Sequence, residues 1–95
     1  MYAVIRRYTF TGQGMAELVK EKGDDLRKTM AKTPGFKSYS MVLADATLAT
    51  ITMCDDAAGA AASNRIAADW VKANMPASIQ MSAPETTEGE VALSS

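Results

Sequence analysis

The side chains best suited to chemistry lie along one face of a helix predicted over residues 57–74. At 100° per residue, a single stripe of this helix carries an indole and three polar groups, namely Trp70, Ser63, Asn64 and Asn74. A buried amide or hydroxyl without a partner costs on the order of 1–3 kcal/mol, so a purely packing face would normally exclude such groups. One interpretation is therefore a ligand pocket, with Trp70 as its wall and the three polar side chains as its hydrogen-bonding groups.

The same stripe also has a structural interpretation. In that case Ser63 bonds back into its own helix, Asn74 caps the helix end and Trp70 belongs to the core. Both interpretations stay open on the sequence.

A second candidate group lies on a strand predicted over residues 2–10. Arg6 and Arg7 point to opposite faces of this strand, which we expect to be central in its sheet. A buried guanidinium needs a partner, and the favoured one is Glu88 or Glu90 on the final predicted strand. In the alternative, Arg6 lies beside Tyr8 and binds an anionic or enolic substrate oxygen.

The helix predicted over residues 15–32 has an interruption in its apolar stripe, at Lys22 and Gly23. Glycine costs about 1 kcal/mol against alanine inside a helix, and here it would make room for a ligand or for close packing onto the sheet. Lys22 either extends along the helix edge to solvent, which is the commoner behaviour, or faces an anionic ligand.

Several kinds of catalytic site are excluded by composition. The chain has no histidine, so it has no imidazole general base, no Ser–His or Cys–His pair and no imidazole ligand for haem or zinc. Its one cysteine, Cys54, allows no internal disulfide and no zinc site by itself. Asp55 and Asp56 disfavour the Cys54 thiolate, so we expect no reactive role for it. The sequence predicts no metal site and no bound cofactor.

Length and charge bound the remaining possibilities. With 95 residues, the chain is expected to form a single domain over residues 1–95. Its net charge of −1 and its lack of a basic patch argue against a nucleic-acid partner. No apolar run approaches the roughly 20 residues that span a membrane, and residues 1–10 lack the apolar core of a signal peptide. We therefore expect a cytoplasmic protein.

The elements that must position these side chains follow the order β-α-β-β-α-β. Strands are predicted over residues 2–10, 36–43, 48–54 and 86–93, helices over 15–32 and 57–74, and a loop over 77–85. This order predicts an α+β, ferredoxin-like fold, in which a four-stranded antiparallel sheet has its first and third strands in the centre and both helices on one face. The other sheet face would be apolar and bare, which predicts a homodimer formed sheet to sheet.

Four segments of the chain resemble the dimeric α+β barrel superfamily, and within it the antibiotic-biosynthesis-monooxygenase-like family. They are residues 1–5, the turn 34–36, the helical segment 67–71 around Trp70, and residues 89–91. The resemblance implies a homodimeric barrel with a small pocket between each sheet and its helices. It also implies cofactor-free oxygenation of aromatic polyketides or quinols in some members and haem degradation in others. The haem-degrading branch needs a histidine ligand, which this chain lacks.

Three functional hypotheses remain. In the first, the chain is a cofactor-free oxygenase in which Trp70 walls the pocket, Arg6 with Asn64 or Asn74 polarises a substrate oxygen, and Tyr8 hydrogen-bonds that oxygen. In this hypothesis Ser63, Asn74 and Lys22 also contact the substrate. In the second, the chain binds a small apolar or aromatic molecule without chemistry. In the third, it is a dimeric structural domain with a filled core.

Overall fold

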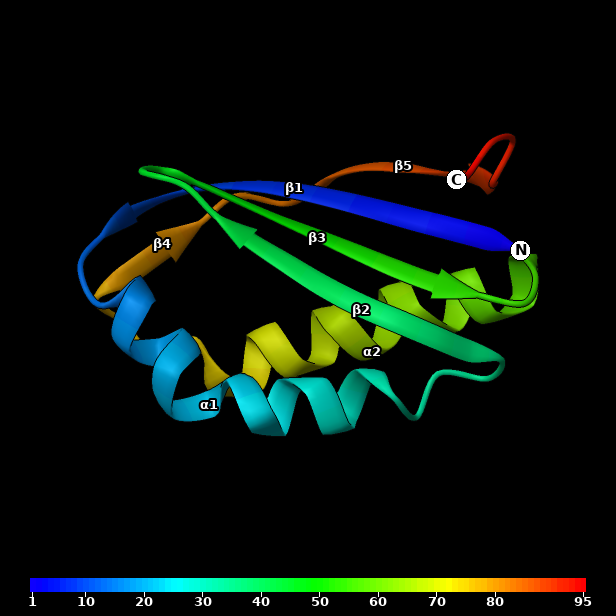
Figure 1. The fold of residues 1–95 in the computed structure, drawn as a ribbon. Helices are drawn as coiled ribbons and strands as arrows, with labels where there is room; N and C mark the ends of the chain where they lie inside the picture. The colour runs from blue at the N-terminus through cyan, green and yellow to red at the C-terminus, as the bar shows by residue number, and fades with distance from the viewer.

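The computed structural model describes the whole chain, from Met1 to Ser95, as one α+β unit (Figure 1). Its elements are β1 (Tyr2–Gly12), α1 (Met15–Met30), β2 (Phe36–Leu43), β3 (Thr47–Cys54), α2 (Ala57–Asn74), β4 (Ile79–Met81) and β5 (Glu85–Glu90). The predicted order of strands and helices is confirmed. The sheet, however, has five strands, because β4 lies inside the segment that was predicted to be a loop.

All pairings in the sheet are antiparallel, and its order is β2-β3-β1-β4, with β5 also beside β1. β1 and β3 are therefore central, as predicted. β4 pairs with residues 10–12 of β1, and β5 pairs with residues 2–7, so the two short strands act as one edge strand in two pieces. The break between them ends in Pro84, which has no N–H to donate to a ladder.

Both helices cover the same face of the sheet (Figure 1). Alternate residues of the central strands point toward them, because successive strand side chains point to opposite faces. The buried residues of β1 are Val4, Arg6 and Tyr8, and those of β3 are Leu48, Thr50, Thr52 and Cys54. Arg6 is therefore held by strand alternation in the layer between sheet and helices.

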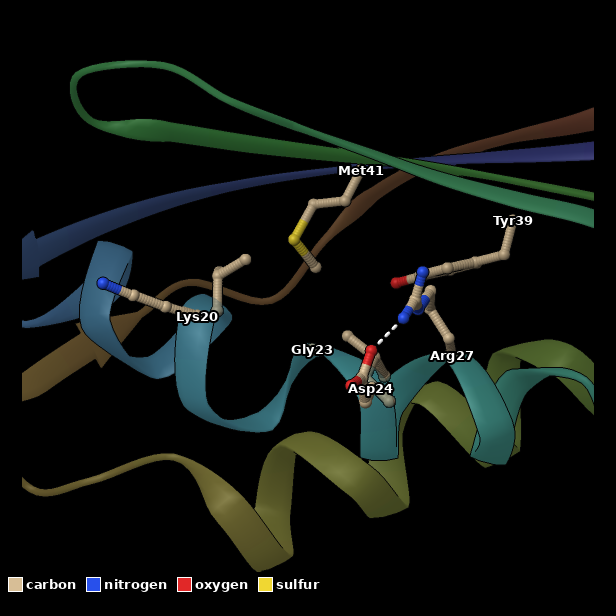
Figure 2. Close-up of a pocket in the computed structure, with 8 residues that line it drawn as sticks. Lys20, Gly23, Asp24, Arg27, Tyr39 and Met41 are labelled. Carbon is tan, nitrogen blue, oxygen red and sulfur yellow. Dashed lines mark hydrogen bonds and ion pairs between the residues drawn. The ribbon is translucent and has the colours of Figure 1, made fainter.

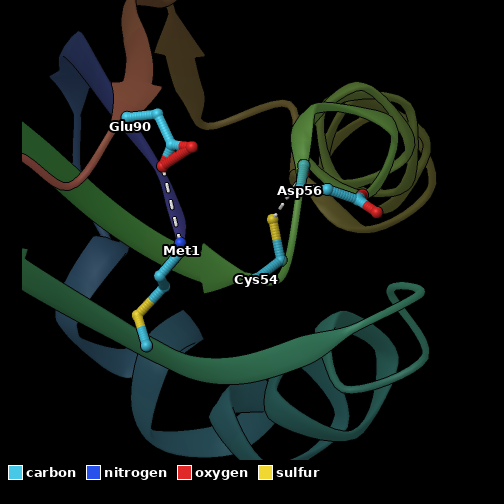
Figure 3. Close-up of polar contacts among 4 residues, drawn as sticks. All are labelled: Met1, Cys54, Asp56 and Glu90. Atoms are coloured by element: carbon cyan, nitrogen blue, oxygen red, sulfur yellow. Dashed lines mark hydrogen bonds and ion pairs between the residues drawn. The ribbon is translucent and has the colours of Figure 1, made fainter.

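The start of α2 is fixed close to the end of β3. The Asp56 carboxylate caps the helix by accepting a hydrogen bond from the backbone N–H of Gly59, at 3.0 Å. A Cβ at Gly59 would lie 2.4 Å from the carbonyl oxygen of Pro34, so only glycine fits this approach. Figure 3 shows the same corner, where Cys54 Sγ lies 3.4 Å from the carbonyl oxygen of Asp56. It also shows the amino terminus of Met1, 3.5 Å from a Glu90 oxygen.

The opposite face of the sheet has no helix over it. It carries exposed apolar side chains, among them Ile5, which is 43% exposed, and Val42, which is 57% exposed. Neither helix is both long enough and apolar enough to cross a membrane.

Candidate functional site

The polar centre of the molecule is the guanidinium of Arg6, which is only 1% exposed. It donates hydrogen bonds from Nε to Asn64 Oδ1 at 2.8 Å, from one terminal nitrogen to Thr52 Oγ1 at 3.0 Å, and from the other to Ser63 Oγ at 2.6 Å. These contacts join β1 to β3 and α2. All three acceptors are neutral, so the positive charge has no carboxylate bonded to it.

The predicted pairing of Arg6 with Glu88 or Glu90 is therefore wrong. The register places Thr86 opposite Arg6, and Glu88 lies two pairs further along, opposite Val4. Glu90 instead lies near the amino terminus of Met1, and none of the ion pairs in the structure includes Arg6. Burial lowers the pKa of Arg6, while nearby Tyr8 and Glu88 oppose that shift.

A cavity of about 330 Å³ opens beside this guanidinium. It lies between β1, α2 and the segment that joins β4 to β5. Its lining is formed by Arg6, Tyr8, Asn64, Ala68, Val71, Lys72, Met81, Ser82, Ala83, Pro84 and Thr86. The break in the edge strand forms part of the wall: the Ser82 hydroxyl accepts a hydrogen bond from the backbone N–H of Thr9 at 3.0 Å, and the chain then leaves the ladder.

Several of the lining side chains carry hydrogen-bond donors, and those of Arg6, Asn64 and Tyr8 come from the central strand and α2. An arginine carries five N–H donors, and three hydrogen bonds leave two of them free on Arg6. Because Asn64 accepts through Oδ1, its Nδ2 amide group carries donors with no protein partner. Burial raises the pKa of Tyr8, so its hydroxyl stays protonated near neutral pH and is also a donor.

The serine of the predicted stripe serves the network rather than the cavity. Ser63 is fully buried, and its hydroxyl donates to the carbonyl oxygen of Ala60 at 2.7 Å while it accepts from Arg6. It thus makes the bond into its own helix that the structural interpretation predicted. Its contact with Arg6 also fixes the guanidinium against α2.

Trp70 lies elsewhere than expected. Its side chain packs between the helices with Leu26, Met30 and Ala67, and its Nε1–H donates to Asp25 at 2.9 Å. It is absent from the lining of the cavity at Arg6, so we correct its assignment as the pocket wall. Helical periodicity identified the buried face of α2, but that face divides between the sheet and α1.

Asn74 and Lys22 form a separate contact between α2 and α1. Asn74 donates to the carbonyl oxygen of Trp70 at 2.9 Å and accepts from Lys22 at 3.2 Å. Neither residue lines the cavity at Arg6. Their expected contact with a substrate is thus replaced by a link between α1 and α2, because each finds its partner on the neighbouring helix.

No reactive thiol or metal cluster accompanies the site. Cys54 is fully buried, and burial raises the pKa of its thiol; a backbone hydrogen bond at Asp56 opposes this shift, while the charges of Asp55 and Asp56 add to it. No three His, Cys, Asp or Glu side chains come together in a way that could hold a metal ion.

Sequence reasoning missed two parts of the site. Thr52 supplies one of the three acceptors for Arg6, and it was hidden among the β-branched residues of an ordinary strand. The segment 81–84 closes the cavity but was predicted as plain loop. The feature of the sequence that indicates this segment is Pro84, directly before the final strand, because proline in a sheet marks an interrupted edge.

Solved structures share this architecture at low sequence identity. HapK from Hahella chejuensis matches with a TM-score of 0.73 and 15% identity, over 100% of this chain and 96% of its own. SnoaB, a cofactor-independent oxygenase from Streptomyces nogalater, matches with a TM-score of 0.68 and 16% identity, over 98% of this chain and 94% of its own. A dimeric ferredoxin-like protein from an uncultured marine organism matches with a TM-score of 0.68 and 13% identity, over 98% of this chain and 95% of its own.

No family model matches the sequence, and no curated protein matches it either. At these identities the structural matches establish the fold, and activity has to be argued from the site. Structures described as antibiotic biosynthesis monooxygenases match over nearly the whole chain as well. The chain therefore has the ferredoxin-like α+β fold of the antibiotic-biosynthesis-monooxygenase-like proteins, in agreement with the resemblance seen in its sequence.

Proposed function

We propose that this chain is a monooxygenase-like protein that oxidises a small phenolic aromatic substrate in the cavity at Arg6, without a bound cofactor. One observation carries the proposal. A nearly fully buried guanidinium borders a cavity, has two free N–H donors and is bonded only to neutral oxygens. Because an uncompensated buried charge is costly, an anionic ligand oxygen is the natural complement.

The size and lining of the cavity select the substrate class. About 330 Å³ is near the lower end of the 300–1,000 Å³ that small-molecule pockets occupy, which suits an aromatic substrate of one or two rings. Val71, Met81 and Ala68 supply apolar wall, while Arg6, Tyr8 and Asn64 supply hydrogen-bond donors. A phenol fits this division, since its ring is apolar and its oxygen becomes anionic on deprotonation.

The proposed chemistry needs no external reductant. With 1-naphthol as the probe, C10H8O and O2 give 1,4-naphthoquinone, C10H6O2, and one water. The substrate supplies all four electrons: the C–OH becomes C=O, and the para C–H becomes a second C=O. One oxygen atom of O2 enters the product, and the other leaves as water with the hydroxyl hydrogen and the ring hydrogen.

The residues have defined roles in this reaction. Arg6 binds the naphtholate oxygen and stabilises the electron-rich anion, which transfers an electron to O2. Recombination at the para carbon and proton uptake give a hydroperoxide, which loses water to form the quinone. The Nδ2 group of Asn64 and the hydroxyl of Tyr8 donate to the reduced oxygen, and removal of one such donor typically lowers kcat by about 10²–10³-fold.

Oxygen uptake tests this proposal. Purified protein, with a chelator present, should consume one O2 per 1,4-naphthoquinone formed, faster than buffer alone and without H2O2. Asn64→Ala should slow this reaction by about 10²-fold. An uptake rate equal to that of buffer would overturn the activity. If naphthol still binds in that case, the non-catalytic binding hypothesis takes its place.

We further propose that the chain forms a homodimer through its open sheet face. The exposed side chains of Ile5 and Val42 on that face support this, as does the similarity to a protein described as dimeric. Light scattering should give twice the chain mass of 10.1 kDa. Ile5→Lys should shift it toward the monomer, whereas Ala61→Lys on the surface of α2 should not. A wild-type mass of one chain would contradict the proposal.

A further inference from the structure

A second cavity, of about 280 Å³, lies between α1 and β2. Its lining is Val19, Lys20, Gly23, Asp24, Leu26, Arg27, Tyr39 and Met41. It shares no residue with the cavity at Arg6, and the reaction proposed above makes no use of it. In Figure 2, Lys20 lies at one end of this space, Tyr39 and Arg27 lie at the other, and Met41 extends from β2 between them.

Gly23 is the feature of this cavity that packing does not explain. It lies inside α1, where glycine costs about 1 kcal/mol relative to alanine. A Cβ added there would meet no atom within 4 Å, and the backbone of Gly23 is not in the left-handed region. Neither a close approach nor a turn therefore requires glycine at this position. What the missing side chain leaves is open space inside the cavity.

Three aliphatic side chains and one aromatic ring form the apolar part of the wall of this cavity. Val19, Leu26 and Met41 line it, and the thioether of methionine adapts readily to flexible chains. The hydroxyl of Tyr39 points from β2 toward the middle of the space (Figure 2), and burial raises its pKa to about 12, which keeps it neutral. The inner surface thus favours an uncharged, flexible body.

The charges at the rim are not balanced. Asp24 and Arg27 pair with each other, so their charges compensate locally. Lys20 makes no ion pair or side-chain hydrogen bond in the structure and is the free cation of the rim. A ligand with an apolar body and one anionic end would match this arrangement.

We propose that the cavity between α1 and β2 is a binding site for a medium-chain alkyl carboxylate. The carboxylate lies at Lys20, and the chain runs beneath Met41 over Gly23 toward Tyr39. Gly23 sets the length and width of the chain that fits. The site is separate from the proposed oxygenase cavity and does not depend on that activity.

Octanoate, kept below its micelle concentration, is the probe. A titration followed by methyl NMR should shift the signals of Val19, Leu26 and Met41. Gly23→Leu fills the space and should weaken binding by about tenfold or more, since a single misfitting group in an apolar pocket has effects of this size. Lys20→Gln should weaken it by about two- to fivefold, as expected for an exposed ion pair.

Matched variants separate this site from general effects. Ala61→Leu adds the same side chain to the surface of α2, and Lys32→Gln removes a lysine beyond the end of α1; both should bind octanoate as the wild type does. Gly23→Ala keeps the helix, should raise the melting temperature and should weaken binding only slightly. The proposal is overturned if octanoate shifts no signals, if Gly23→Leu binds it unchanged, or if the shifts map to Val71 and Met81 of the Arg6 cavity instead.

Discussion

Replacing Arg6 with methionine is the most informative perturbation of the site. Methionine has a similar length and no charge, so it keeps much of the packing and removes the guanidinium. If Arg6 serves only to hold the fold together, the change affects stability alone. If it binds a phenolate, the change affects ligand affinity far more than stability.

The effect on stability follows from the fate of the three acceptors. Ser63 keeps its bond to the carbonyl oxygen of Ala60, and Asn64 borders the cavity, where water can reach it. Only the hydroxyl of Thr52 stays fully buried without this partner, at a cost of about 1–3 kcal/mol. Removing a buried charge relieves desolvation at the same time. We therefore expect Arg6→Met to be destabilised by no more than about 3 kcal/mol.

The effect on binding should be larger. Deleting one member of a buried, hydrogen-bonded charge pair costs about 2–5 kcal/mol, which lowers affinity by roughly 30-fold at the least. Anaerobic calorimetry with 1-naphthol measures this directly. Titrations in two buffers of different ionisation enthalpy also report the proton that is released when the ligand binds as its anion.

Arg65→Met on the exposed surface of α2 is the matched control, because it removes the same charge outside the cavity. It should bind 1-naphthol like the wild type, with the same proton release. The reasoning is refuted if Arg6→Met binds within about threefold of the wild type, or if the wild type binds without releasing a proton.

Three further predictions concern the fold around the site. Burial raises the pKa of Tyr39 from 10.0 to about 12, so the folded state favours the neutral phenol. The associated stability of roughly 2–3 kcal/mol is present below pH 10 and lost as pH rises through 12. Urea unfolding at a series of pH values should show this loss in the wild type and not in Tyr39→Phe. The same dependence of the free energy of unfolding on pH in both proteins would contradict it. Gly59→Ala should lower the free energy of unfolding by about 1–3 kcal/mol because its Cβ meets the carbonyl oxygen of Pro34, whereas Gly23→Ala should raise it by up to about 1 kcal/mol; the opposite order in thermal denaturation would refute this account of the two glycines. Asp56→Ala should cost about 1 kcal/mol through loss of the α2 cap, and Asp56→Asn should restore most of it; an unchanged melting temperature in the alanine variant would show that the cap contributes nothing.

The fold was predictable because local pattern and connection rules agree along this chain. Alternation identified the strands, helical periodicity identified both helices, and the order β-α-β-β-α-β leaves few arrangements open. Strand alternation also placed Arg6 and Tyr8 on one face. β4 was missed because three residues carry too little alternation to distinguish a strand from a loop.

The site was only partly predictable, for reasons of register. Arg6 was expected to meet Glu88 or Glu90, but the pairing of β5 with β1 places Thr86 at that level, and sequence alone does not fix this offset. The contact between Arg6 and Asn64 joins residues 58 positions apart. Periodicity placed Asn64 near the buried face of α2, and only the packing of α2 on the sheet decides that it meets Arg6 while Trp70 turns to α1.

Isotope labelling tests the central claim most directly. Wild-type protein is incubated with 1-naphthol under 18O2, and the quinone is reduced and trapped at once so that its oxygens do not exchange with water. We predict that the product carries one atom of 18O and forms faster than in buffer. In Arg6→Met, the rate should fall to that in buffer. An unlabelled quinone accompanied by H2O2, or the same labelled yield from Arg6→Met, would contradict monooxygenation at the Arg6 cavity.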